Sequence, residues 1–316
     1  MRLLVTGSAG HLGEALMRTL RDRDAAVRGI DIRPSPFTDR VGSIVDREFV
    51  RDCMDGVDAV LHAATLHKPH VATHRRQDFL DVNITGTLNL LEEAVAAGVG
   101  AFVFTSTTSA FGDALRPPAG EPAAWITEDV VPVPKNIYGV TKTAAEDLCS
   151  LFHRNQGLPC LVLRTSRFFP EDDDDPSRSN AFDRDNLQVC ELLYRRVDLA
   201  DVVQAHLLAI ERAPELGFDR FIVSATTPFE TSDRARLRGD PAGALDRHVP
   251  GWRDAFESRG WRMLEDIERV YVNSRARTVL GWQPEYDFAR AVDDLLQGLD
   301  HRSPLARAVG AKGYRN

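Results

Sequence analysis

The sequence is poor in cysteine, and the few cysteines are scattered. Among 316 residues there is no Cys-x-x-Cys pair and no cysteine spacing typical of metal ligands. A disulfide framework and a structural zinc site are therefore not expected. Packed, reduced thiols indicate a cytoplasmic protein. The four cysteines are Cys53, Cys149, Cys160 and Cys190.

An excess of positive charge and long hydrophobic runs are also lacking. Lysine and arginine number 39 against 47 acidic residues, a net charge of −8 that gives no general attraction for nucleic acid or anionic membrane. No apolar run approaches the roughly 18 residues that span a bilayer. The first strand is expected to begin at residue 2, which leaves no room for a signal peptide. The composition, 43% hydrophobic and 27% charged, is ordinary for a globular protein.

A glycine-rich stretch near the start provides the first functional signal. The apolar run 3–5 leads directly into Gly7, Gly10 and Gly13, and residues 12–20 have apolar positions at helical spacing. Strand, glycine turn and helix together place a helix N-terminus against a phosphate. In such a loop Gly7 makes the tight turn, Gly10 admits a pyrophosphate and Gly13 lets the helix pack on the sheet. A glycine turn without a ligand is the alternative.

The second predicted strand, 27–31, ends in a carboxylate. Asp31 follows Gly13 by 18 residues, close to where an acid meets the adenosine ribose of a dinucleotide. A carboxylate repels a 2′-phosphate, which favours NAD over NADP. Arg33 could accept that phosphate, and a simple turn residue before Pro34 is the other interpretation of Asp31.

Helices and strands alternate up to residue 165. This alternation predicts an α/β fold with a Rossmann-type, doubly wound parallel sheet and right-handed crossovers. The elements expected here are strands at 57–62, 101–105 and 161–163 and helices at 46–54, 77–97 and 136–153.

The pattern changes after Arg164. Residues 166–192 have no clear period, and the acidic run 172–175 is expected to be a solvated loop. We expect an NAD-binding domain at 1–165 and a mainly substrate-binding lobe at 166–316, loosely ordered from His301 onward. Segments 195–225 and 268–274 are expected to return to the core. Later elements are expected at 198–212, 221–223, 270–272, 274–280 and 287–299.

Polar residues follow the third and fourth predicted strands. His70 and His74 could share a helical face, but no carboxylate or cysteine lies at a suitable spacing, so no metal site is expected. The hydroxyl cluster 105–109 follows a strand at the edge where open α/β sheets bind ligands. In the helix at 136–153, Tyr138 and Lys142 are four residues apart and share a face.

Taken together, these segments resemble the extended short-chain dehydrogenase/reductase family, in its NAD-dependent epimerase/dehydratase branch. The likeness covers nearly the whole chain, with every element in family order. It implies a polar small-molecule substrate and a homodimer formed through helices 77–97 and 136–153. The matching residues are Gly7, Gly10, Gly13, Asp31, His62-Ala63-Ala64, Val82 to Thr87, Thr105-Ser106-Thr107, Phe111-Gly112, Tyr138, Lys142, Val197 to Ala205 with Asp201, and Leu280-Gly281-Trp282-x-Pro284.

The resemblance also implies roles for individual residues. Tyr138 is the general acid/base, Lys142 is its electrostatic partner and a ribose contact, and Thr107 binds the substrate oxygen. Thr108 or Ser106 takes the place of Thr107 if the alignment shifts by one residue. A free tyrosine has a pKa near 10, and a nearby ammonium together with the positive nicotinamide favours the phenolate. The implied cofactor contacts are Gly7, Gly10, His11, Leu12, Gly13, Asp31, Ile32, Ala63, Ala64, Asn83, Thr105, Tyr138 and Lys142.

Two positions depart from the family pattern. Phe111 stands where the family often has tyrosine, and Arg167 stands about where sugar-nucleotide enzymes usually place an asparagine. With Phe168 and Thr108, Arg167 is a candidate substrate residue, since a guanidinium suits a carboxylate or phosphate. A salt bridge from Arg167 to the acids at 171–175 is the alternative.

Three functions follow from these patterns. The first is an NAD-dependent epimerase acting on a hydroxyl of a sugar, a sugar nucleotide or a similar polar substrate. The second is a dehydrogenase or reductase of a polar, possibly anionic hydroxy or keto substrate. The third, of another class, is a non-catalytic NAD-sensing protein on the same fold. The set Thr107, Tyr138 and Lys142 argues against the third, because a binding module needs no activated phenol.

Overall fold

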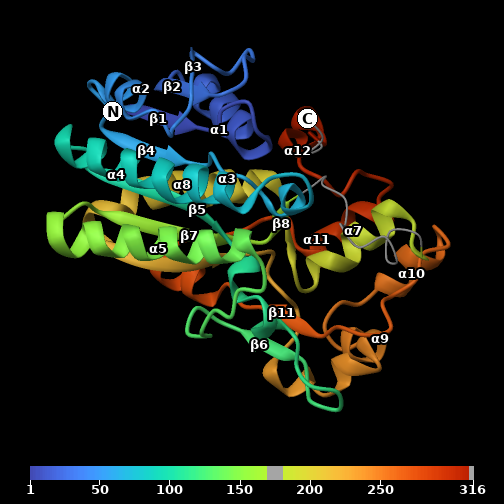
Figure 1. The fold of residues 1–316 in the computed structure, drawn as a ribbon. Helices are drawn as coiled ribbons and strands as arrows, with labels where there is room; N and C mark the ends of the chain where they lie inside the picture. The colour runs from blue at the N-terminus through green and yellow to red at the C-terminus, as the bar shows by residue number, and fades with distance from the viewer. Residues whose placement is uncertain (169–180, 313–316) are drawn as a thin grey trace.

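A computed structural model describes residues 1–168 and 181–312. Its centre is a seven-stranded sheet in the order β3-β2-β1-β4-β5-β7-β10, and all neighbouring strands pair in parallel (Figure 1). The expected doubly wound α/β fold is confirmed. The strands are β1 (Arg2–Thr6), β2 (Ala26–Asp31), β3 (Arg40–Val41), β4 (Ala59–His62), β5 (Ala101–Thr107), β7 (Cys160–Thr165) and β10 (Phe218–Val223).

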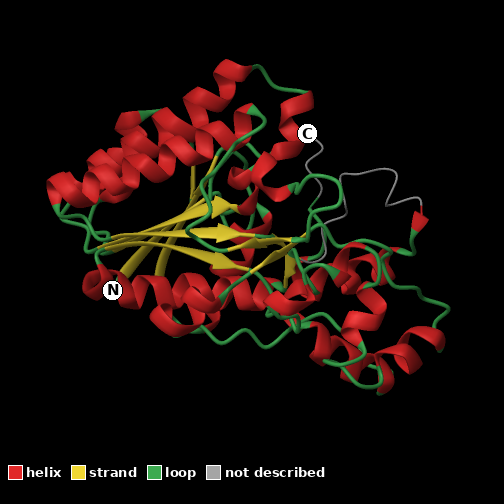
Figure 2. Cartoon of the chain, turned by 90° about the horizontal axis from the view of Figure 1, so that it is seen from below, coloured by secondary structure: helices red, strands yellow, loops and turns green. Residues whose placement is uncertain are grey.

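Helices cover both faces of this sheet (Figure 2). In β1, Leu3 and Val5 point into a core shared with α1 and α8, while Leu4 points into a second core shared with α2, α4 and α5. Successive side chains of a strand point to opposite faces of the sheet, so a strand that is buried on both faces places its apolar residues in both cores. The helices are α1 (His11–Asp22), α2 (Arg47–Met54), α3 (Arg76–Leu80), α4 (Gly86–Ala96), α5 (Ile137–Gln156) and α8 (Leu199–Leu216).

The remaining elements form a smaller lobe beside the carboxyl ends of the strands. It contains two small parallel sheets, β6 (Ala124–Ile126) with β11 (Arg269–Tyr271) and β8 (Arg167–Phe168) with β9 (Arg196–Val197). Of the later strands, β10 joins the central sheet, whereas β11 pairs with β6 in the lobe. The helices outside the central layers are α7 (Arg184–Leu192), α9 (Pro241–Leu245), α10 (Trp252–Glu257), the π-helical turn at Ala276–Leu280, α11 (Phe288–Leu296) and α12 (Pro304–Val309).

Two late motifs contact each other at the start of α8. The indole Nε1 of Trp282 donates to the Asp201 carbonyl oxygen at 3.0 Å, and the Asp201 carboxylate accepts from the backbone of Glu285 and Tyr286 at 2.9 Å each. Residues 81 to 85 positions apart in the sequence therefore fix the C-terminal segment to the nucleotide-binding half.

The expectation of a loose tail from His301 is wrong. His301 and Ser303 are buried, Ser303 N donates to the Asp198 carboxylate at 3.0 Å, and α12 packs against α1 and α8. Lys312 then pairs with Glu14 of α1. These are tertiary contacts, which local composition does not reveal. Among the described helices, none combines the length and apolar character needed to cross a bilayer.

Candidate active site

The glycine loop joins β1 to α1 at the carboxyl edge of the sheet. Gly7 has a φ of +73°, and a Cβ on it would lie 2.8 Å from Ala64 N. A Cβ on Gly13 would lie 1.9 Å from the Gly7 carbonyl oxygen. Both positions therefore require glycine. Gly10 is the N-cap of α1 and makes no side-chain cap, so the first amides of the helix face the cleft.

Asp31 ends β2 beside this loop. Its carboxylate accepts hydrogen bonds from Ala9 N at 3.0 Å and Arg33 N at 2.9 Å, so it is fixed to the glycine loop. The Arg33 side chain is 60% exposed, with its Nε 4.0 Å from the carboxylate. The arrangement presents one oriented acid at the end of β2, as a ribose contact requires.

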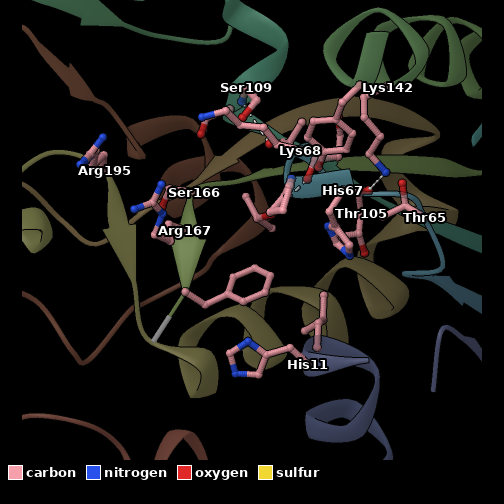
Figure 3. A pocket seen from close by; sticks show the side chains of 18 of the residues that line it. His11, Thr65, His67, Lys68, Thr105, Ser109, Lys142, Ser166, Arg167 and Arg195 are labelled. Carbon is pink, nitrogen blue, oxygen red and sulfur yellow. Dashed lines mark hydrogen bonds between the residues drawn. The ribbon is translucent and has the colours of Figure 1, made fainter. Parts of the chain in front are cut away.

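The carboxyl ends of β1, β4, β5 and β7 open into one cavity of about 980 Å³, which residues of the lobe such as Arg269 and Tyr271 also line; Figure 3 shows some of the lining side chains. This volume lies near the upper end of the range found for small-molecule binding sites. Four of the predicted cofactor contacts, Asp31, Ile32, Ala64 and Asn83, do not line it. Those that do are Gly7, Gly10, His11, Leu12, Gly13, Ala63, Thr105, Tyr138 and Lys142, together with the predicted substrate residues Thr107, Thr108, Arg167 and Phe168.

Tyr138 and Lys142 project from the first turns of α5. Asn136 caps this helix by accepting from Gly139 N at 3.0 Å. The Lys142 Nζ donates to the Thr105 carbonyl oxygen at 2.6 Å. The Tyr138 phenol is hydrogen-bonded to the Thr107 hydroxyl. The helix and the end of β5 therefore bring the three predicted catalytic groups together.

Burial governs the protonation of this pair. It lowers the pKa of Lys142 to about 7, an effect opposed by the Glu146 carboxylate. It raises the pKa of Tyr138 to about 12, an effect opposed by the hydrogen bond from Thr107. The sequence predicts a lowered pKa for Tyr138. These side chains alone do not lower it, because the desolvation of the phenolate has a larger effect on the pKa than the hydrogen bond from Thr107.

Asn83 lies in a π-helical turn, Asp81–Thr85, between α3 and α4. Its Oδ1 accepts from Leu66 N and from Thr65 Oγ1, both at 2.8 Å, and its Nδ2 donates to Thr141 Oγ1 at 3.0 Å. The amide thus ties the segment after β4 to α5. Such π-turns are frequent at functional sites.

The histidines have separate environments. His62 is buried between two hydroxyls, Thr6 Oγ1 at 2.8 Å and Thr87 Oγ1 at 2.9 Å, as in a structural contact. His67 lines the cavity, with its ring centroid 6.3 Å from that of Tyr138. Within residues 1–168 and 181–312, no group of three or more potential ligands is placed to hold a metal ion.

Arg167 and Phe168 form β8 at the opposite side of the cavity from Lys142 (Figure 3). The Arg167 guanidinium lies 3.8 Å from the buried Glu191 carboxylate, which also pairs with Arg195. The other acids considered for Arg167, at 171–175, lie outside the described residues. Phe168 contacts the His11 ring edge-on, with centroids 5.5 Å apart.

Sequence reasoning missed two groups of cavity residues. Arg195 and Ser166 stand beside Arg167 (Figure 3). Arg116, Lys135 and Arg269 also line the cavity. No spacing pattern connects these side chains, because they come from separate loops and from strands of the lobe.

Comparison with known proteins agrees with this geometry. A model of the NAD-dependent epimerase/dehydratase family matches residues 3–217. An uncharacterized UDP-glucose epimerase, YtcB, from Bacillus subtilis is 30% identical over 185 residues, which cover 52% of this chain. The chain spans about half, 55%, of that relative's length.

Two further proteins match over longer stretches. Uronate dehydrogenase from Pseudomonas syringae pv. tomato is 26% identical over 265 residues, covering 78% of this chain and 88% of the relative. A short-chain dehydrogenase/reductase superfamily protein from Agrobacterium tumefaciens, solved with bound NAD, has a TM-score of 0.68 and 26% identity. That match covers 98% of this chain and 97% of the other. The chain belongs to the NAD-dependent epimerase/dehydratase family.

Proposed function

We propose that the protein is an NAD-dependent enzyme that transfers a hydride at a hydroxyl-bearing carbon of an anionic, sugar-like substrate. The observation that carries this proposal is that one cavity is lined both by the glycine loop and by the Thr107, Tyr138 and Lys142 side chains. The first suits a dinucleotide pyrophosphate and the second suits proton transfer from an alcohol.

The residues fit the cofactor. Gly7 and Gly13 admit no side chain, so the loop packs tightly against the segment after β4 and against the start of α1. Gly7, Gly10 and Gly13 all line the cavity, where the N-terminus of α1 suits a pyrophosphate. Asp31 would accept from the adenosine ribose hydroxyls, and Lys142 would contact the nicotinamide ribose. When bound, NAD⁺ supplies the hydride acceptor.

The chain's own groups handle the proton. Thr107 orients the substrate hydroxyl toward the Tyr138 oxygen, which accepts its proton as the carbon is oxidised. The Lys142 ammonium stabilises the negative charge of the Tyr138 phenolate. Because burial raises the pKa of Tyr138 to about 12, nearby positive charge is needed for it to act as a base near neutral pH.

Arg167, with Phe168 and Thr108, is proposed to bind the substrate. Arg167 and Arg195, which share the buried Glu191 carboxylate, both line the cavity on the side far from Lys142 (Figure 3). The names of two relatives, the UDP-glucose epimerase and the uronate dehydrogenase, support an anionic substrate, since UDP-glucose carries a diphosphate and a uronate carries a carboxylate.

A substrate panel with NAD⁺ tests the proposal. Uronates, UDP-sugars and a neutral hydroxysteroid would be incubated with the enzyme while NADH absorbance and sugar configuration are followed. A dehydrogenase gives NADH in proportion to substrate consumed. An epimerase changes the configuration with catalytic NAD⁺ and no net NADH. Activity confined to the neutral compound would contradict the anionic assignment, and NAD binding without any hydride exchange would favour the non-catalytic alternative.

The Asp31→Asn substitution is expected to weaken the preference for NAD⁺ over NADP⁺. It removes the charge that repels a 2′-phosphate, so the ratio of the NADP⁺ to the NAD⁺ dissociation constant should fall by at least about tenfold. Fluorescence titration with both cofactors measures the ratio. Asp52→Asn, which removes an exposed carboxylate of α2, is the control. An unchanged ratio in Asp31→Asn would refute the proposed ribose contact.

We also propose that the chain forms a homodimer through α4 and α5. These helices pack against each other on one face of the sheet (Figure 1), and α5 leaves Val140 and Leu151 47% and 38% exposed. Light scattering after size exclusion should give about twice the chain mass of 35.1 kDa. Leu151→Glu should shift the protein toward monomer. A monomer in the wild type would refute this arrangement.

A further inference from the structure

A buried carboxylate, Glu146, lies one helical turn beyond Lys142 on the same face of α5. Glu146 is 1% exposed, and its Oε1 accepts from the Ser106 hydroxyl at 2.5 Å. Ser106 stands between Thr105, whose carbonyl oxygen accepts from Lys142, and Thr107. Through Glu146, α5 therefore holds the end of β5 at Ser106. This residue lies between Thr105 and Thr107, which contact Lys142 and Tyr138.

Two arginines from neighbouring strands fix the other side of this carboxylate. Arg164 of β7 donates through Nη2 to Glu146 Oε2 at 2.7 Å, and its side chain is 4% exposed. Arg220 of β10 donates through Nε to the same oxygen at 3.2 Å and also reaches Asp147. Three strands and one helix thus meet at a single carboxylate, which the proposed chemistry does not itself use.

The charges around Lys142 come from three elements. His62 faces it from β4, and His67 faces it from the segment before η1 (Lys68–Ala72). Burial and the charge of Lys142 lower the pKa of both histidines, that of His67 to about 3. From α5, Cys149 faces it as a buried thiol with a raised pKa. These three groups are therefore neutral near pH 7. Among the described groups acting on Lys142, Glu146 is the one that carries negative charge.

We propose that Glu146 is a positioning residue for the catalytic pair: its carboxylate favours the ammonium form of Lys142 and holds β5 in register with α5. The inference rests on the proposed role of Lys142. Its test does not depend on turnover, so failure of this inference can be distinguished from failure of the proposed function.

The protonation of Lys142 can be measured directly, because the chain contains only four lysines, Lys68, Lys135, Lys142 and Lys312. With ¹³C-lysine labelling of the full chain, four Cε signals are expected, and Lys142→Met identifies the one that titrates near pH 7. Glu146→Gln removes the negative charge that opposes the effect of burial on Lys142. The pKa of Lys142 should therefore fall by about 1.

The matched control is Asp147→Asn. This acid is the next residue of α5 and also contacts Arg220, but its side chain is 73% exposed. It should change the pKa of Lys142 by much less, because solvent screens it. Glu146→Gln also leaves Arg164 buried without its counterion, so the double variant Glu146→Gln/Arg164→Gln is measured if the single variant is unstable. The double variant should also lower the pKa of Lys142.

An unchanged Lys142 pKa in the folded Glu146 variants would overturn the inference, and so would an equal shift in Asp147→Asn. Ser106→Ala separates the two parts of the role. It keeps the charge, so the pKa of Lys142 should stay near that of the wild type, while the Thr105 and Thr107 amide signals should move. If those signals stay in place, the registering role of Glu146 is refuted.

Discussion

The Tyr138→Phe variant is expected to lose about 10²- to 10⁴-fold in kcat for hydride transfer, the usual contribution of a general acid/base. Phenylalanine keeps the ring, which is 6% exposed, so the packing of α5 should persist. The hydrogen bond to Thr107 and the proton acceptor are lost together. Steady-state kinetics on an active member of the substrate panel measures the effect.

Two comparisons make this result specific. The NAD dissociation constant should change little in Tyr138→Phe, since the glycine loop and Asp31 are untouched. Tyr286→Phe, which alters a tyrosine in the loop that contacts α8, should keep the wild-type kcat. Full activity in Tyr138→Phe would remove the phenol from the mechanism.

The second large effect is expected from Gly13→Ala. A methyl group here would lie 1.9 Å from the Gly7 carbonyl oxygen and 2.8 Å from Ser8 Cα. Both are backbone atoms, so the loop itself must move away from α1. Forced shifts of this kind cost about 1–3 kcal/mol, which corresponds to about 5- to 150-fold weaker NAD binding if the loop holds the pyrophosphate.

Gly239→Ala is the matched substitution, because nothing lies within 4 Å of the added Cβ and its φ of −160° suits any residue. Its NAD affinity should equal that of the wild type. Thermal unfolding of both variants separates loss of the loop geometry from loss of the fold. Undiminished NAD binding by folded Gly13→Ala would place the cofactor elsewhere.

The nucleotide-binding half could be predicted because its signals are local. Gly7, Gly10 and Gly13 follow a strand at fixed intervals, and Tyr138 and Lys142 are one helical turn apart. Each pattern belongs to a single strand, turn or helix, so no long-range contact is needed to recognise it. The parallel order of the sheet follows from the alternation of these elements.

The lobe could not be predicted in the same way. In α7, seven of nine residues are buried, so no polar face gives the segment a 3.6-residue period. The strands β8 and β9 have two residues each, too few for a pattern. The end of the chain gains order through Asp198, Glu14 and the packing of α12 on α1 and α8, all of which lie far away in the sequence.

The candidate site shows the same division. The roles expected for Thr107, Tyr138 and Lys142 rest on their sequence motif, and the structure places the three together. Glu146 had no motif, since its importance depends on Arg164 and Arg220 of two other strands. Asn83 was predicted as a cofactor-positioning residue, and its contacts with Thr65 and Leu66 depend on a π-turn that the sequence pattern does not distinguish from an ordinary helix.

Single-turnover hydride transfer tests the central claim most directly. Enzyme saturated with NAD⁺ would be mixed with a lower concentration of each anionic substrate while NADH absorbance is recorded. The account predicts a rise with at least one substrate, transient in an epimerase and lasting in a dehydrogenase, and about 10²- to 10⁴-fold slower in Tyr138→Phe. No rise with any substrate, or an equal rate in Tyr138→Phe, would contradict it.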